Sequence, residues 1–206
     1  MKRSAICISL VVLFAGVSLA TDGLLLTPKP KYLEVTGEDF LLKPGTAIEI
    51  PEGFSERDRF ALDLLREQVA ERTGLTLPAH KLAKAPKIIL TIAGRDDALI
   101  EKELKEALLI PRPESPEGYV LLVTPERVLI VGIDAPGLFY GVQTFLQLLG
   151  DVGPAYKVPG VQISDWPEST IRGVMVDSSQ GALPSVEMVK RVIRTMAQFK
   201  LNRYYM

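Results

Sequence analysis

Asp177 is the residue whose type and position best suit chemistry on a ligand. It follows directly after the apolar segment 171–176 and opens a loop that contains Ser, Gly and Pro. A carboxylate at this place can accept hydrogen bonds from a ligand, or it can cap the loop that follows. Asp96 and Asp97, which are adjacent to each other in the sequence, could form a paired-carboxylate site. Their position before a helical segment is explained more simply by helix capping.

Other reaction chemistries lack the residues that they require. The sequence has one Cys and one His, which excludes a zinc ribbon, a Cys nucleophile and a disulfide scaffold. The single histidine, His80, has no partner pattern around it, and we expect it at the surface. No phosphate-binding Gly loop, His-Glu-x-x-His or Gly-x-Ser-x-Gly motif occurs. The sequence therefore predicts neither a metal site nor a cofactor.

The composition is that of a globular protein. There are 24 Lys and Arg residues against 25 Asp and Glu, which gives a formal net charge of −1, and 47% of the residues are hydrophobic. The apolar fraction is large enough for a real core. A nucleic-acid binder would show an excess of basic residues, so no nucleic-acid partner is expected.

Residues 1–20 have the layout of a secretory signal peptide. Lys2 and Arg3 precede an apolar run, and Ser18-Leu19-Ala20 places small residues at the −3 and −1 positions before Thr21. The apolar run is short compared with the ~20 residues of a membrane span. We expect a secreted or periplasmic protein without membrane contact after cleavage. An uncleaved N-terminal anchor is the alternative.

The next part, residues 21–153, is predicted to form an α+β domain. A capping box of Ser55 and Asp58 begins one helix, which Gly74 ends, and Asp134 with Pro136 begins another. A small antiparallel sheet with the helices on one face is the packing we expect. The expected elements are extended segments over 24–50, a helix over 55–74, a strand over 87–93, a helix over 97–109, a tight hairpin of strands 118–124 and 127–133, and a helix over 134–149.

The pattern changes after residue 153. Residues 154–170 contain several Pro and Gly and are predicted to be a linker, in which Trp166 is a packing anchor or a sugar-stacking platform. Residues 171–176 predict a strand, 185–200 a helix and 201–206 the start of a second strand. Apolar strands that alternate with helices favour a parallel sheet. Because a lone unit of this kind has no sheet to bury its faces, we interpret the sequence as a fragment of a longer protein.

Four stretches of the sequence together resemble a known enzyme family. They are residues 26–31 (Leu-Thr-Pro-Lys-Pro-Lys), 116–125 (with Pro-Glu-Gly-Tyr and Val-Thr-Pro), 135–149, and the set 165–167 (Asp-Trp-Pro), 172–177 and 200–203. In order and spacing they resemble bacterial β-N-acetylhexosaminidases of glycoside hydrolase family 20. Any one of the four would be weak alone, whereas the third and fourth are specific in combination.

The resemblance implies an N-terminal accessory domain followed by a (β/α)8 barrel, of which residues 171–206 would be the truncated start. It implies substrate-assisted hydrolysis of terminal N-acetylhexosamine from glycans. In that reaction the 2-acetamido carbonyl attacks the anomeric carbon, a Glu is the general acid and the preceding Asp orients the acetamido group. In the family this pair lies beyond the second barrel strand, so no catalytic residue is expected in this chain. The choice of sugar, the linkage and the oligomeric state are left open.

One substrate-binding position of the family falls inside the chain. The family pattern D-x-S-R-H follows the first barrel strand, and its Arg binds sugar hydroxyls. The matching residues here are Asp177-Ser178-Ser179-Gln180-Gly181. Gln180 can exchange hydrogen bonds with hydroxyls but lacks the charge and the bidentate fork of Arg. The resemblance thus implies Asp177 and Gln180 as substrate-binding residues, with altered specificity or a different grip on the sugar.

Two other functions remain open from the sequence. One is a non-catalytic carbohydrate-binding or scaffolding domain, which would bind saccharides through exposed aromatic residues. The other is a fragment without activity of its own. Its apolar faces over 171–176 and 185–200 would then favour aggregation.

Overall fold

The computed structural model describes residues 24–51, 53–80, 83–84, 86–95, 97–104, 111–113, 115–152, 155–177, 179, 181 and 183–206. The predicted signal peptide, residues 1–20, lies outside this range. Within the described residues, no helix combines the length and the apolar character that a membrane span needs.

A mixed sheet of seven strands forms the centre of the N-terminal part, in the order β1-β10-β6-β7-β5-β3-β4. The pairs among β1, β10, β6 and β7 are antiparallel, and those among β7, β5, β3 and β4 are parallel. The largely antiparallel sheet expected from the sequence is therefore wrong for three of the six strand pairs. Helical connections return the chain to the same end of the sheet, which makes neighbouring strands parallel. The strands are β1 (Tyr32–Val35), β3 (Ala47–Glu49), β4 (Ala79–His80), β5 (Lys87–Ile92), β6 (Tyr119–Val123), β7 (Arg127–Gly132) and β10 (Val161–Asp165).

The predicted helix starts are confirmed. Helix α1 (Glu56–Thr73) begins after Ser55, whose backbone N–H donates to the Asp58 carboxylate at 2.6 Å, and ends at Gly74, where φ is 71°. Helix α3 (Ala135–Leu148) begins after Asp134, which accepts a hydrogen bond from the N–H of Gly137 at 2.8 Å. Local sequence determines both caps, because each bond spans three residues.

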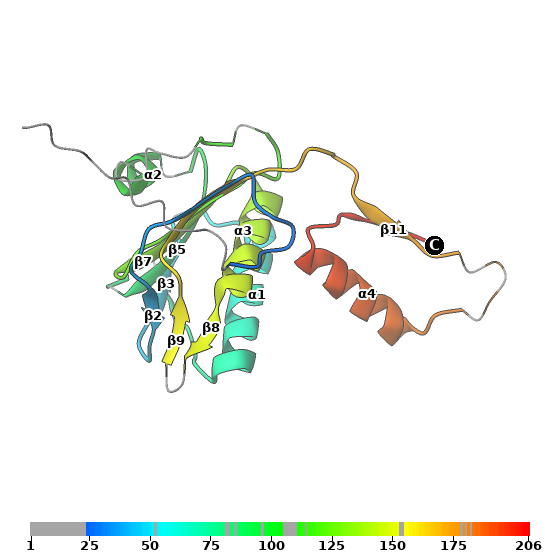
Figure 1. Ribbon diagram of the computed structural model, residues 1–206, viewed down its shortest axis with the longest axis horizontal. Coiled ribbons are helices and arrows are strands. Elements are labelled where there is room, and N and C mark those ends of the chain that lie inside the picture. Colours follow the sequence, from blue (N-terminus) through cyan, green and yellow to red (C-terminus); the bar gives the residue numbers. More distant parts are fainter. Residues whose placement is uncertain are drawn as a thin grey trace, which may run out of the picture.

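The helices cover both faces of the sheet (Figure 1). Helices α1 and α3 pack on one face over the larger core. On the other face, α2 (Asp97–Leu104) packs Ile100 and Leu104 against β5, β6 and β7. The expectation that all helices share one face is therefore wrong. Strand β6 is buried at every position, so both of its faces need a cover. Residues 105–110, where α2 was expected to continue, lie outside the described residues.

The predicted linker over 154–170 contains two strands. Strand β9 (Ala155–Val158) lies in a separate three-stranded sheet between β2 (Phe40–Leu42) and β8 (Gly150–Val152), and β10 lies between β1 and β6 in the main sheet. Val161 and Ile163 are fully buried there, alternating with Gln162. Pro159 and Gly160 form the turn between the strands rather than a flexible connection. After β10, the described residues 166–172 are irregular and lead to the next strand.

The C-terminal residues form a separate strand–helix–strand unit, as the sequence predicted (Figure 1). Strand β11 (Gly173–Met175) pairs in parallel with β12 (Arg203–Tyr205), and α4 (Val186–Gln198) connects them. We call residues 171–206, which contain β11, α4 and β12, the C-terminal unit, and the described residues before 171 the sheet domain. Met196 is buried, whereas the apolar side chains of Ile193 and Phe199 are 48% and 44% exposed. Two short strands are too narrow to cover the whole apolar face of α4.

Candidate functional site

Asp177 lies at the carboxyl edge of the C-terminal unit. Because β11 and β12 run parallel, both end at this edge, and Asp177 follows β11 just as Met206 follows β12. The Asp177 carboxylate is exposed, and its Oδ1 accepts a hydrogen bond from the N–H of Ser179 at 2.8 Å. Gln180, the second predicted substrate-binding residue, lies outside the described residues.

The Asp177 carboxylate is an acceptor rather than a proton donor. Hydrogen bonds from the side chain and the backbone of Ser179 hold the pKa of Asp177 below its ordinary value. The group is therefore ionised at neutral pH, when it can accept hydrogen bonds but not donate one. Its bond to Ser179 supports the loop-capping role, and its exposure is compatible with a contact to a ligand hydroxyl.

The opposite, amino ends of the same two strands are held by one carboxylate of the sheet domain. Glu117 Oε2 accepts from Arg172 Nη2 at 2.5 Å, and Glu117 Oε1 accepts from Asn202 Nδ2 at 3.2 Å. Arg172 immediately precedes β11, and Asn202 immediately precedes β12.

A second contact between the two parts is a buried ion pair. The Lys200 ammonium donates to Asp165 Oδ2 at 2.9 Å and to the Tyr119 hydroxyl at 2.8 Å. The side chains of Lys200 and Asp165 are only 8% and 12% exposed. The Tyr119 hydroxyl also bonds the hydroxyl of Thr144 at 2.7 Å. We call Lys200, Asp165, Tyr119 and Thr144 the lysine cluster.

Burial sets the protonation of the lysine cluster. Desolvation lowers the pKa of Lys200, and the Asp165 charge opposes this shift. Desolvation raises the pKa of Tyr119 well above its ordinary value, and the Asp165 charge adds to the rise. The phenol therefore stays neutral across the physiological range and serves the ammonium as a neutral acceptor.

A pocket of about 400 Å³ lies between the sheet domain and the C-terminal unit, beside the lysine cluster. Trp166 lines it, stacks on the Tyr32 ring at a centroid distance of 5.7 Å, and has the Lys31 ammonium 5.3 Å from its ring centre. Phe199 reaches the same pocket from the C-terminal unit. These contacts support the packing role of Trp166 over the sugar-stacking alternative.

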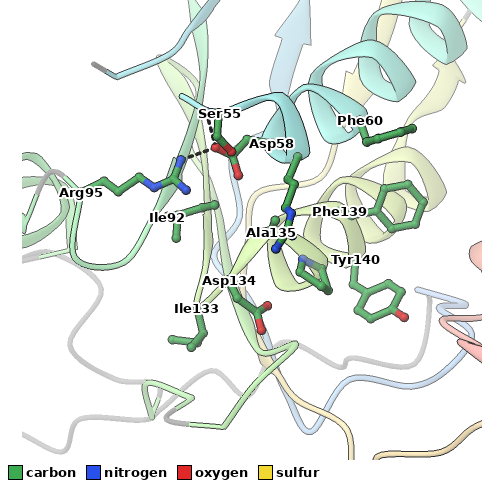
Figure 2. Close-up of a pocket in the computed structure, with 12 residues that line it drawn as sticks. Ser55, Asp58, Phe60, Ile92, Arg95, Ile133, Asp134, Ala135, Phe139 and Tyr140 are labelled. Carbon is green, nitrogen blue, oxygen red and sulfur yellow. Dashed lines mark hydrogen bonds and ion pairs between the residues drawn. The ribbon is translucent and has the colours of Figure 1, made fainter. Parts of the chain in front are cut away.

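A larger pocket, of about 780 Å³, lies where α1 and α3 begin (Figure 2). On one side, Asp58 forms an ion pair with Arg95 and also caps α1. Asp134 caps α3 and accepts two further bonds from the N–H of Glu117 at 3.2 and 3.1 Å. These carboxylates are occupied in closing helix ends, so the arrangement does not provide a general acid and base.

The remaining residues that the sequence singled out have structural positions. His80 is exposed in β4, as predicted. Asp97, the first residue of α2, accepts a hydrogen bond from the N–H of Gly94 at 2.9 Å, so its carboxylate closes the turn before the helix; Asp96 lies outside the described residues. Among the residues that the structure describes, no cluster of His, Cys, Asp and Glu could hold a metal ion.

Sequence reasoning missed the lysine cluster and the role of Glu117. Their contacts join residues that are far apart in the chain: 35 positions for Lys200 and Asp165 and 85 for Asn202 and Glu117. A signal was nevertheless present. Glu117, Asp165, Arg172 and Lys200 all belong to the stretches that carry the family resemblance, and the structure brings those stretches together.

The fold is shared by solved structures of glycoside hydrolase family 20. A solved glycoside hydrolase family 20 β-N-acetylhexosaminidase from Streptomyces coelicolor matches with a TM-score of 0.71 and 30% identity, over 87% of this chain and 33% of that one. A family 20 β-N-acetylglucosaminidase matches with a TM-score of 0.64 and 33% identity, over 88% of this chain and 30% of that one.

The sequence comparison gives the family. A β-hexosaminidase of Porphyromonas gingivalis is 32% identical over 190 residues, which are 89% of this chain and 22% of that relative. Residues 24–166 match the model of glycosyl hydrolase family 20, domain 2. The chain belongs to glycoside hydrolase family 20. It spans about a fifth of the length of the Porphyromonas relative.

Proposed function

We propose that this chain is the N-terminal part of a secreted β-N-acetylhexosaminidase that removes terminal N-acetylhexosamine from glycans. The observation that carries the proposal is the family match over residues 24–166. The structural match with the Streptomyces enzyme covers 87% of the chain, more than residues 24–166 alone supply. A family-20 sheet domain is thus followed by a parallel unit with a carboxylate, Asp177, at its carboxyl edge.

The C-terminal unit is proposed to begin a (β/α)8 barrel. In such barrels the active site lies at the carboxyl ends of the strands. Asp177 lies at that end of β11, and Gln180 follows three positions later in the sequence. We propose that these two side chains contact sugar hydroxyls and do not take part in bond cleavage.

The proposed chemistry is substrate-assisted and proceeds with retention. The acetamido carbonyl oxygen of the sugar bonds to the anomeric carbon as the glycosidic C–O bond breaks, and a Glu protonates the leaving oxygen. Water then opens the cyclic intermediate and returns a proton to that Glu. The two carboxylates of this scheme are assigned to no residue of this chain, so the 206 residues alone are expected to be inactive.

The test compares two proteins on a chromogenic N-acetyl-β-hexosaminide. One is the 206-residue chain, and the other is the product of the reading frame continued past the Met206 codon. We expect hydrolysis by the longer product and none by the chain. A continued product that carries an Asp-Glu pair but does not hydrolyse would contradict the proposal. So would a stop codon after Met206 together with saccharide binding by the chain, which would favour a binding domain.

A further inference from the structure

The residues that join the two parts have an unusual backbone. Among the described residues other than glycine, positive φ angles occur at Glu117, with 63°, and at Lys200, with 59°. Side chains other than glycine adopt this region rarely, and it persists where the surrounding contacts over-determine it. Both residues place their side chains in the contact between the sheet domain and the C-terminal unit.

The contacts of the lysine cluster form only when the C-terminal unit is docked on the sheet domain in one position. Its ammonium and carboxylate are nearly excluded from water, so separating them would leave each charge without its partner. The Asp165 carboxylate is also fixed on the other side, since its Oδ1 accepts from the N–H of Lys31 at 3.3 Å. Tyr119 is 1% exposed, and its hydroxyl bonds Thr144 of α3. The cation therefore enters a preformed and rigid acceptor site.

Because of its position along the chain, Lys200 connects several elements of the C-terminal unit to the sheet domain. It lies between α4 and β12, and its carbonyl accepts a bond from Arg172 Nε at 2.9 Å. One residue thus links the start of β11, the end of α4 and the start of β12 to the sheet domain. Among the described residues, the other contacts between the two parts include a hydrogen bond from Gln147 of α3 to the carbonyl of Gln198 at 3.3 Å and one from Arg172 Nη2 to the Tyr140 hydroxyl at 3.4 Å.

We propose that Lys200 is a positioning residue: with Asp165 and Tyr119 it latches the C-terminal unit onto the sheet domain, and the Glu117 pair is the second point of attachment. The latch fixes the amino ends of β11 and β12, which determines where Asp177 lies at their other end. The proposal concerns the docking of the two parts, so it stands independently of what the site binds or cleaves.

The sequence contains a single tryptophan, and it reports on this latch directly. Trp166 lines the pocket that Lys200 and Phe199 also line. When the C-terminal unit leaves the sheet domain, the indole gains access to water. Its emission then shifts to longer wavelength, and acrylamide quenches it more strongly. The far-ultraviolet circular dichroism of the sheet domain reports separately on folding.

The experiment uses the 206-residue chain and three variants: Lys200→Met, Asp165→Asn and the double variant that combines these two changes. The control variant is Lys157→Met. It removes the ammonium of another Lys–Asp pair, which is 2.7 Å long but more exposed and lies in the three-stranded sheet. For Lys200→Met we expect about tenfold faster amide exchange over residues 172–176 and 202–205, unchanged exchange in β5 and β7, and a red-shifted Trp166 emission. In the double variant, the protection of these amides from exchange should fall by less than the sum of the two single effects, because neither charge is left unpaired.

Two results would overturn the latch. One is unchanged exchange over 172–176 and 202–205 in Lys200→Met, and the other is an equal rise in β5 and β7. If the circular dichroism shows that Lys200→Met does not fold, Tyr119→Phe is measured in its place. This variant keeps the Lys200 and Asp165 charges and removes one acceptor of the Lys200 ammonium. Faster exchange confined to the C-terminal unit in that variant supports the latch, and a uniform or absent change refutes it.

Discussion

The Arg172 guanidinium and the Glu117 carboxylate form an ion pair across the contact between the C-terminal unit and the sheet domain, 55 positions apart in the chain. Their side chains are 17% and 21% exposed. The same carboxylate holds Asn202, so a single residue of the sheet domain restrains the beginnings of two strands.

Glu117→Gln should therefore destabilise the chain by about 1–3 kcal/mol, since it leaves the largely buried Arg172 charge without its carboxylate partner. Urea unfolding followed by circular dichroism measures the change. Glu168→Gln is the matched control, because it breaks the pair with Lys31 at a side chain that is 86% exposed. The control should cost less than about 1 kcal/mol. Equal losses in both variants would contradict a special role for Glu117.

Asp58→Ala should cost about 1–2 kcal/mol at pH 7 through the lost cap of α1, and more with the lost Arg95 pair. Asp63→Ala, at an exposed position of the same helix, is the control. Burial alone would raise the pKa of Asp58, but hydrogen bonds from Ser55 and the charge of Arg95 lower it below its ordinary value. The stabilisation is therefore complete above the unfolded pKa and disappears as pH falls through the lower, folded pKa. The difference in unfolding free energy between Asp58→Ala and Asp63→Ala should therefore become smaller as the pH is lowered. A difference that stays constant with pH would show that the Asp58 charge does not cause the stabilisation.

Gly160→Ala should destabilise the sheet domain by about 1–3 kcal/mol. A Cβ atom at this position would lie 2.2 Å from the carbonyl oxygen of Glu38, and backbone cannot move aside cheaply. At Gly150 the nearest atom to such a Cβ is 3.9 Å away, so Gly150→Ala should be close to neutral. Thermal unfolding of the two variants measures the contrast. A neutral Gly160→Ala would show that the β9–β10 turn adjusts freely.

Gln180→Arg tests the proposed sugar contact in the continued reading-frame product. A guanidinium adds a charge-assisted, bidentate donor, so KM for an N-acetyl-β-hexosaminide should fall about tenfold while kcat changes little. Gln68→Arg, on α1, adds the same charge on the sheet domain. An unchanged KM in Gln180→Arg would indicate that this loop does not contact the sugar. An equal fall in the control would indicate a general effect of charge.

Local signals made part of this fold predictable. The caps at Ser55 and Asp134 and the hairpin turn at residues 124–127 need only neighbouring residues, and each was expected correctly. The face on which α2 packs was not, because periodicity identifies an apolar stripe and not the surface that it meets. Strand β10 was missed because the Pro residues on both sides suggested a linker.

The site was predictable only where one stretch of chain carries it. Asp177 follows its strand in sequence, so its edge position could be inferred. The acceptors of Lys200 come from β6 and from the end of β10, which no local pattern brings together.

The location of β10 in the middle of the sheet has a consequence for synthesis on the ribosome. Among the described strands, β1 (residues 32–35) pairs with β10 (residues 161–165) alone, and β6 needs the same partner on one side. Until about residue 165 has left the exit tunnel, β1 has no place in the sheet and β6 presents an open, apolar edge. The nascent sheet domain can therefore close only once β10 is available, and a recombinant boundary drawn at residue 153 would remove that strand and leave an open, apolar edge that favours aggregation.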